Sequence, residues 1–183
     1  MSENCYKIRN EEGIHFKTFA VVNWVDLFTR KEYRDIIIES IKHCQTSKGL
    51  VLHSWCLMSN HIHLVISAKE HNTSDILRDF KKFTSKQILQ AIKEHPQESR
   101  RVWMLNIFEQ AGQQNSRNKN HQFWQQDNQP KELYSQNFAQ QKLAYIHNNP
   151  VAEGIVDKPE DYLYSSARDY YNTTKGLLDI VFI

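Results

Sequence analysis

Short apolar runs and helical stripes divide the chain into strands and helices. Apolar and β-branched residues crowd together over residues 15–24 (HFKTFAVVNW), Leu50–Leu57 and His61–Ala68, and runs of this length predict strands. Ser59 and Asn60, which favour tight turns, join the second run to the third. We therefore expect an antiparallel hairpin whose second strand begins with two histidines.

Two helices are predicted around this hairpin by apolar residues spaced three or four apart. The first follows Thr29, which has a glutamate three residues later as in a capping box, and ends at Gly49. The second is capped by Thr73 or Ser74 and ends before Pro96.

A third helix is expected near the C-terminal end. Pro130 suits a first helical position, and 131–149 has helical composition without glycine. Pro150 disfavours helical geometry at the residue before it, so Asn149 is expected at or just beyond the helix end. Tyr145 and Asn149 are four positions apart and would share one side of this helix.

Residues 98–129 show no clean period. Arginine and lysine occur among many Gln and Asn residues, and we expect a polar, Gln/Asn-rich loop region near 110–129. The aromatic residues of the segment allow two interpretations, a surface for single-stranded nucleic acid or a loop anchored by a buried tryptophan. These residues are Trp103, Phe108, Phe123 and Trp124.

Composition fits a single domain over residues 1–183, with 40% hydrophobic residues in a chain long enough to bury a core. The net charge of +2 is too small to demand a polyanionic partner. Three widely spaced cysteines indicate a reducing compartment, and neither a signal segment nor a long apolar stretch is present. We expect a cytoplasmic protein without a membrane partner.

His61 and His63 are the first candidates for chemistry. Alternate residues of a strand point to one face, whereas on a helix these two would diverge by about 200°. Nine histidines in 183 residues give about 0.4 His-x-His pairs by chance. Two structural histidines, satisfied by hydrogen bonds or solvent, are therefore an equally simple interpretation of the pair alone.

A basic row lies on the second predicted helix, opposite its apolar stripe. Arg78, Lys82 and Lys86 recur at four-residue steps. Such a row is either a solvated face or a set of phosphate contacts that positions nucleic acid without reading its sequence.

A combination of motifs resembles a known family. Residues 58–64 (MSNHIHL) are followed much later by 145–151 (YIHNNPV), with smaller matches at 123–125 (FWQ), 159–162 (PEDY) and 165–170 (SSARDY). Together they resemble the REP-associated tyrosine transposases, relatives of the single-tyrosine HUH transposases of insertion sequences. The matches extend over most of the chain, to about residue 171.

The resemblance implies an α+β fold of the ferredoxin-like HUH type, an antiparallel β-sheet with helices packed on it. It implies that His61 and His63 bind a divalent metal, Mg²⁺ or Mn²⁺, with Asn149 as a third ligand. It also implies that Tyr145 is the catalytic nucleophile. The implied partner is single-stranded or stem-loop DNA, and both a monomer and a homodimer remain open. The candidate DNA-contacting residues are Arg78, Lys82, Lys86 and Arg168.

The expected reaction is consistent with elementary chemistry. A tyrosine hydroxyl, with an ordinary pKa of about 10, needs help to attack at neutral pH. Two imidazoles and an amide oxygen, with open positions, suit a Lewis-acidic Mg²⁺ or Mn²⁺. Attack by Tyr145 on single-stranded DNA would give a 5′-phosphotyrosine and a free 3′-OH, and reversal would rejoin strands. No ATP site is needed, which agrees with the lack of a Gly-rich phosphate loop.

Two other functions stay open on the residues alone. A catalytically inactive DNA hairpin-binding protein derived from a transposase would use the basic and aromatic residues and keep structural histidines. A metalloenzyme unrelated to nucleic acid would use the histidine pair without the basic row.

Overall fold

The computed structural model describes residues 8–115, 120–126, 129–171 and 174–183. Four antiparallel strands form one sheet in these ranges, in the order β2-β3-β1-β4. The strands are β1 (His15–Ala20), β2 (Leu50–Leu57), β3 (His61–Ala68) and β4 (Lys131–Glu132). The α-helices are α1 (Lys31–Lys48), α2 (Thr73–Glu94), α3 (Arg101–Gln113), α4 (Gln136–Ala152) and α5 (Ala167–Tyr171), and two 3₁₀ turns are η1 (Val22–Trp24) and η2 (Pro159–Asp161). The predicted α+β fold with an antiparallel sheet is confirmed.

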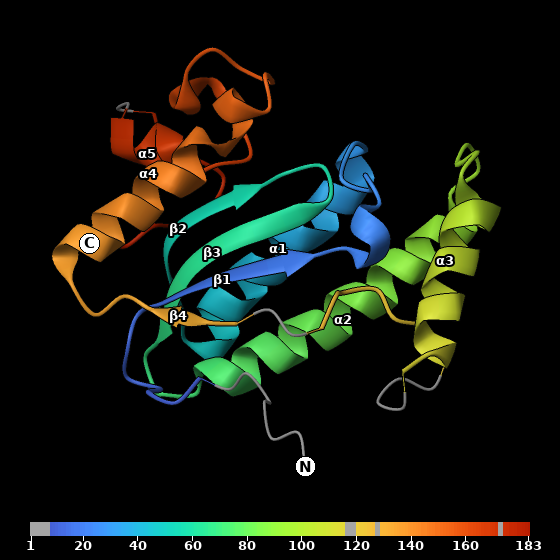
Figure 1. Ribbon diagram of the computed structural model, residues 1–183, viewed down its shortest axis with the longest axis horizontal. Helices are drawn as coiled ribbons and strands as arrows, with labels where there is room; N and C mark the ends of the chain where they lie inside the picture. Colours follow the sequence, from blue (N-terminus) through green and yellow to red (C-terminus); the bar gives the residue numbers. More distant parts are fainter. Residues whose placement is uncertain (1–7, 116–119, 127–128, 172–173) are drawn as a thin grey trace.

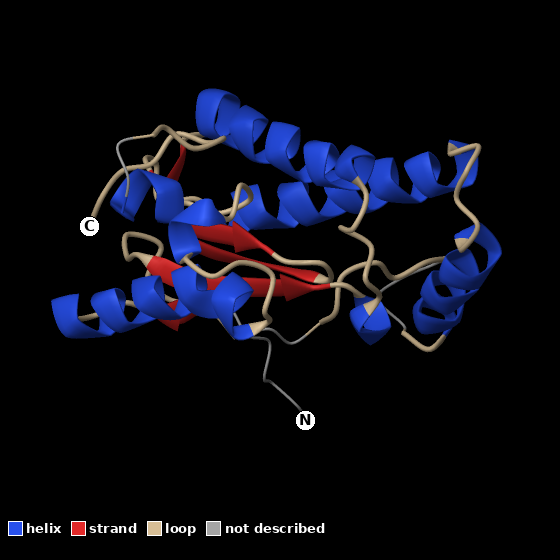
Figure 2. Ribbon diagram, turned by 90° about the horizontal axis from the view of Figure 1, so that it is seen from above, coloured by secondary structure: helices blue, strands red, loops and turns tan. Residues whose placement is uncertain are grey.

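The sheet lies between two helical layers. Helices α1 and α2 pack side by side over one face, and α4 lies over the other (Figures 1 and 2). Helix α3 packs against α2 and η1 at one end of the molecule, whereas α5 lies beside η2 near α4. No helix in the described ranges combines the length and the hydrophobicity needed to span a membrane.

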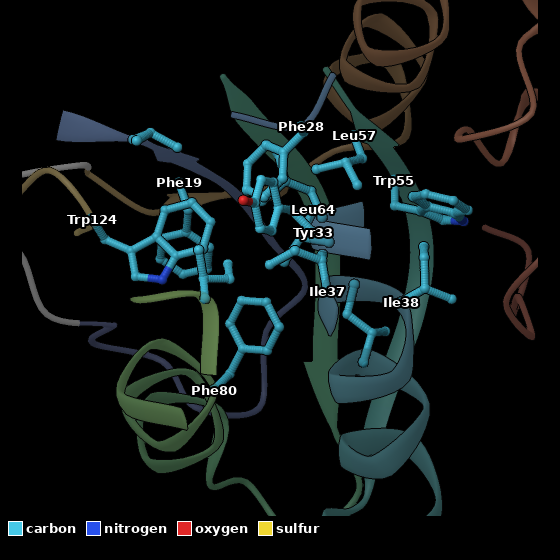
Figure 3. Close-up of a cluster of buried hydrophobic side chains, with 14 of the residues drawn as sticks. Phe19, Phe28, Tyr33, Ile37, Ile38, Trp55, Leu57, Leu64, Phe80 and Trp124 are labelled. Atoms are coloured by element: carbon cyan, nitrogen blue, oxygen red, sulfur yellow. The ribbon is translucent and has the colours of Figure 1, made fainter. Parts of the chain in front are cut away.

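Strand β3 sends alternate side chains into the two layers. Ile62, Leu64 and Ile66 are buried in the large core beneath α1 and α2. Figure 3 shows Leu64 among aromatic and aliphatic side chains of this core. Val65, on the other face of the strand, belongs to a smaller core that includes Ile146 of α4. The predicted alternation is confirmed, and it leaves the histidines on the α4 side of the sheet.

The hairpin was predicted correctly, and the first strand only in part. β2 and β3 pair antiparallel over the predicted residues. β1 ends at Ala20, not at Trp24, because the next residues turn into η1, where Asn23 and Trp24 take positive φ angles of 54° and 53°.

The first two helices end as predicted but begin without the predicted caps. Gly49 is the C-cap of α1 with φ 72°, a left-handed conformation that glycine tolerates. The N-cap of α1 is Arg30, not Thr29, and the N-cap of α2 is Asn72, just before the predicted Thr73 or Ser74. Neither N-cap side chain accepts a hydrogen bond from its helix.

The third predicted helix begins later and ends later than expected. Residues 131–132 form β4 because they pair with the free edge of β1, and α4 begins after Ser135, whose side chain accepts the Phe138 N–H. Pro150 does not end the helix: Glu153 N–H donates to the Asn149 carbonyl and Gly154 N–H donates to Val151. Asn149 therefore sits within α4, one turn after Tyr145.

The segment predicted as irregular contains helix α3. The loop expected near 110–129 begins only after Gln113, and residues 116–119 and 127–128 of it lie outside the described residues. Trp124 is buried, with its Nε1–H donating to Thr84 Oγ1 at 3.0 Å, so this part is anchored by a buried tryptophan. Trp103, in contrast, is an exposed residue of α3.

Candidate active site

Two imidazole nitrogens converge on the α4 side of the sheet. His61 and His63 project from the same face of β3, and their Nε2 atoms are 3.0 Å apart. His63 is buried and also stacks on Phe16 of β1, whereas His61 is partly exposed. The strand geometry expected for the pair is therefore present.

The hydrogen bonds around Asn60 fix the tautomer of His61. Asn60 Nδ2 donates to Asp26 Oδ1 at 3.0 Å, and because a carboxylate only accepts, the orientation of the amide is determined. Asn60 Oδ1 is then the atom 2.7 Å from His61 Nδ1, which must carry the hydrogen. His61 Nε2 consequently presents a lone pair, as a metal ligand requires.

Thr18 of β1 controls the second imidazole. Thr18 lies opposite His63 in the β1–β3 register, and its Oγ1 is 2.8 Å from His63 Nδ1. Because His61 Nε2 is an acceptor, the contact between the two Nε2 atoms makes His63 Nε2 the donor and leaves Thr18 to donate to Nδ1. For His63 to bind a cation through Nε2, its proton must move to Nδ1 and Thr18 must accept. A hydroxyl can do either.

The pair fits one octahedral cation. Two ligand atoms about 2.1 Å from an ion and at right angles to each other are about 3.0 Å apart, which matches the separation of the two Nε2 atoms. Burial lowers the pKa of His61, and burial together with the neighbouring His61 and Lys142 lowers the pKa of His63 to about 3. Both rings are neutral at pH 7, the form that binds metals.

Tyr145 of α4 reaches the histidine pair. Its ring centroid is 5.3 Å from that of His63, at an interplanar angle of 68°, and 6.2 Å from that of Phe16. The residue is 51% exposed, so a macromolecular substrate has access to it. Lys142, one turn earlier on α4, places Nζ 5.4 Å from the centroid of the tyrosine ring. A cation thus lies beside the candidate nucleophile.

Asn149 joins the same group of side chains. Its Nδ2 donates to the Tyr145 carbonyl at 2.6 Å, which identifies the other amide atom as the oxygen. A side-chain hydrogen bond between Asn149 and His63 opposes the lowering of the histidine pKa, so the two side chains meet. No three His, Cys, Asp or Glu side chains in the described ranges could hold a metal together. An amide oxygen is a suitable additional ligand for Mg²⁺ or Mn²⁺.

His147, between Tyr145 and Asn149 in sequence, points away from this group. It is buried, and its Nε2 lies 3.1 Å from Ser54 Oγ on β2 and 2.9 Å from Ser166 Oγ. Burial lowers its pKa to about 4. These contacts attach α4 to the sheet, so His147 anchors the helix that carries the tyrosine.

The basic residues are not gathered around the tyrosine. Arg78, Lys82 and Lys86 lie on α2, which covers the opposite face of the sheet. Arg78 forms ion pairs with Asp75 and Asp79 on its own helix. Lys82 and Lys86 border a hollow of about 460 Å³ that also involves the 120–126 segment. Arg168 belongs to α5, and within the described residues its buried Nε has no hydrogen-bond partner.

Comparison with known families identifies the chain. Residues 15–111 match the model of a transposase family described as IS200-like. The chain belongs to the IS200-like transposases. The matched residues of this IS200-like transposase extend from β1 into α3 and include His61 and His63, and they end before Tyr145. The relationship to insertion-sequence transposases that the motifs indicated is confirmed.

A solved structure shares the fold. It is described as a REP-associated tyrosine transposase bound to a REP hairpin. The similarity covers 100% of this IS200-like transposase and 95% of the other chain, with a TM-score of 0.59 and 17% sequence identity. No curated protein matches the chain.

Several residues that shape the site were missed in the sequence. Asp26 and Thr18 orient the two histidines, and Lys142 accompanies the tyrosine. Lys142 could have been found because it lies three residues before Tyr145 on a predicted helix. Thr18 depends on the register between β1 and β3, and Asp26 on a turn that places it beside Asn60, so neither carries a local signal.

Proposed function

We propose that this transposase cleaves and rejoins single-stranded or stem-loop DNA through a covalent 5′-phosphotyrosine intermediate on Tyr145. The observation that carries the proposal is the 5.3 Å separation between the rings of Tyr145 and His63, beside two Nε2 atoms spaced for one cation. Membership in a transposase family and the hairpin-bound relative with the same fold support DNA as the substrate.

In the proposed reaction, the Tyr145 hydroxyl attacks the phosphorus of a DNA phosphodiester. The Tyr145 Oη–P bond forms while the P–O3′ bond breaks, the phenol loses its proton, and the departing 3′ oxygen gains one. The 5′ side of the break stays attached to the protein. Attack by a 3′-OH on the phosphotyrosine reverses these changes and rejoins a strand without ATP, because the covalent bond conserves the phosphodiester energy.

His61, His63 and Asn149 are the residues that would hold Mg²⁺ or Mn²⁺. When bound, the cation would act as a Lewis acid toward the scissile phosphate. The protein's own contribution is orientation: Asn60 and Thr18 direct the Nε2 atoms, and the His147 contacts hold α4 against β2. Lys142 adds positive charge beside the phenol, where negative charge develops during attack.

The site is proposed to be complete within one chain. Tyr145 and His63 meet without a second copy, and the loop and β4 that lead into α4 place the helix on its own sheet. A monomer is therefore sufficient for cleavage in this proposal.

The deciding experiment uses Tyr145→Phe. Purified protein is mixed with Mn²⁺ and labelled stem-loop oligonucleotides carrying single-stranded extensions, and the covalent adduct is detected on denaturing gels. We expect an adduct with the wild type and none with Tyr145→Phe. Tyr134→Phe is the matched control, because Tyr134 is 81% exposed just before α4 and its loss should leave the adduct unchanged.

Two results would contradict the proposal. An adduct that survives in Tyr145→Phe would place the nucleophile elsewhere. Stem-loop binding by the wild type that persists in EDTA, with no adduct in Mn²⁺ or Mg²⁺, would instead favour a catalytically inactive DNA hairpin-binding protein.

A further inference from the structure

A large aromatic surface lies open beside the histidine pair. Trp24 is 55% exposed, and its ring centroid is 5.7 Å from that of His61, edge to face at 79°. Tryptophan normally contributes most of its area to a core or an interface. Contact with His61 accounts for one part of the indole, and more than half of the residue remains in water.

The backbone at this point is strained. Asn23 and Trp24 have consecutive positive φ angles, 54° and 53°. Glycine adopts this conformation without steric cost, whereas for a bulky residue it is a genuine outlier. Such strain persists only where the surroundings impose it, and it is concentrated at functional sites.

Buried neighbours impose the conformation. Val22 and Val25, on either side of the strained pair, are buried at 5% and 3% exposure. Val22 N–H donates to the Phe123 carbonyl, and Trp24 N–H donates to the Val21 carbonyl. Because both ends of the turn are fixed in the core, the two residues between them project outward, and the indole comes to rest against His61.

We propose that Trp24 is a stacking platform for an unpaired nucleobase of the nucleotide adjoining the scissile phosphate. The inference rests on the proposed function, which places that phosphate at the His61–His63 pair. A base attached one nucleotide from this phosphate comes within reach of the indole that touches His61. Every base has an aromatic face, so the contact selects for a base that is unpaired more than for its identity.

The occupant is a base and not a second protein chain because of the neighbouring chemistry. The exposed indole adjoins two imidazoles whose Nε2 atoms are 3.0 Å apart, a spacing suited to one cation and, through it, to a phosphate, and an exposed phenol completes the group. A nucleotide supplies both parts of the complement, an anionic phosphate and a flat apolar ring.

The experiment is an abasic scan, carried out with Tyr145→Phe protein so that the DNA stays intact. The probe is the stem-loop oligonucleotide that forms the adduct with wild type, and each single-stranded nucleotide is replaced in turn by an abasic analogue. Affinity is measured by fluorescence anisotropy in Mn²⁺. The same scan is repeated after adding Trp24→Ala, Trp24→Phe or, as a control of similar exposure (53%) on α3, Trp103→Ala.

We expect one position at which loss of the base weakens binding about tenfold, in the range known for stacking on an aromatic side chain. Trp24→Ala should weaken binding of intact DNA by the same factor and have no effect once that base is absent. With Trp24→Phe, loss of this base should still weaken binding by most of the wild-type factor. With Trp103→Ala, loss of this base should weaken binding as it does for the wild type.

Other outcomes would overturn the inference. Stacking is excluded if Trp24→Ala lowers the affinity for intact and abasic DNA equally. It is also excluded if Trp24→Ala does not lower the affinity at all. If Trp24→Ala lowers the affinity equally on both DNAs and also abolishes the stabilisation by Mn²⁺ in thermal denaturation, Trp24 positions His61 and does not contact the DNA. Failure of the wild type to form any adduct is a separate result, which removes the proposed function and with it this inference.

Discussion

The phenol ring of Tyr145 lies edge to face on the imidazole of His63, with 5.3 Å between their centroids. One ring comes from α4 and the other from β3, and the contact is made within a single chain. Helix α4 is held in this position by buried polar contacts, including the one between His147 Nε2 and Ser166 Oγ. The relative placement of these two rings is therefore a property of the folded chain.

A complementation assay tests whether one chain completes the site. We expect no adduct when Tyr145→Phe is mixed with His63→Ala, because neither chain holds both halves. Gel assays as above, over a range of protein concentrations, provide the measurement. Appearance of adduct in the mixture would show that α4 of one chain serves the histidines of another.

Thermal denaturation with Mn²⁺ can show that metal binding requires His63 but does not require the proposed nucleophile Tyr145. Mn²⁺ at 100 times its dissociation constant should stabilise the wild type by about 2.7 kcal/mol. His63→Ala should abolish the shift, whereas Tyr145→Phe should retain it although it forms no adduct. A full shift in His63→Ala would place the cation elsewhere and contradict the two-histidine site.

The hydroxyl of Thr18 should be required for metal affinity. Thr18→Val keeps the shape of the side chain but cannot accept from His63 Nδ1–H, so the tautomer that frees Nε2 loses its partner. We expect Mn²⁺ affinity to fall about 10- to 100-fold, as for other partners of metal-bound histidines. Thr18→Ser should bind nearly as well as wild type. Calorimetric titration measures both, and equal affinity in Thr18→Val would show that the hydroxyl is dispensable.

The regular elements were predictable because their signals are local. The alternation in 61–68 and the apolar stripe of α2 identify strand and helix directly. Helix α3 was missed although Met104, Phe108 and Gly112 recur at four-residue steps and are its buried residues. The signal is weak because a glycine occupies one core position, where an added Cβ would meet the His121 backbone nitrogen at 2.6 Å.

The candidate site was predictable only where a motif carried it. The motifs gave both the histidine pair and the Tyr145–Asn149 spacing, and the structure brings the two segments together. β4 is only two residues long and exists because β1 offers a free edge. The conformation of Trp24 depends on buried residues on both sides of a turn, which no local pattern reveals.

Salt dependence should distinguish the three basic residues of α2. Arg78 already pairs with Asp75 and Asp79, whereas in the described part of the chain Lys82 and Lys86 make no ion pair. If phosphates contact this face, Lys82→Gln and Lys86→Gln should each reduce the slope of log affinity against log salt by about 1. Arg78→Gln should change it less. Equal, unchanged slopes in all three would mean that DNA does not reach α2.

Glu98 should make the fold sensitive to acid. Its side chain is fully buried between Arg30 and Arg100, with Nε–carboxylate distances of 2.9 and 3.1 Å. Burial alone would raise the pKa of Glu98, but hydrogen bonds from Arg100 and Tyr33 and the charge of Arg100 lower it from 4.5 to about 2. Between these values the unfolded chain binds more protons than the folded one. The stabilisation is thus complete above about pH 4.5 and is lost as the pH falls through 2, a total of about 3 kcal/mol.

Glu98→Gln tests this directly by denaturant unfolding at several pH values. We expect the variant to be less stable than wild type by about 3 kcal/mol at pH 7, with a difference that shrinks as the pH falls from 4.5 toward 2. Glu39→Gln is the control, because Glu39 is 68% exposed in its pair with Lys42 and should change stability by less than about 1 kcal/mol. A constant difference at every pH would show that lost packing, and not the charge of the carboxylate, accounts for the effect. Arg100 also donates a hydrogen bond to the Asp26 carbonyl. Loss of the ion pairs of Glu98 should therefore also loosen the turn whose Asp26 orients Asn60 and, through it, His61.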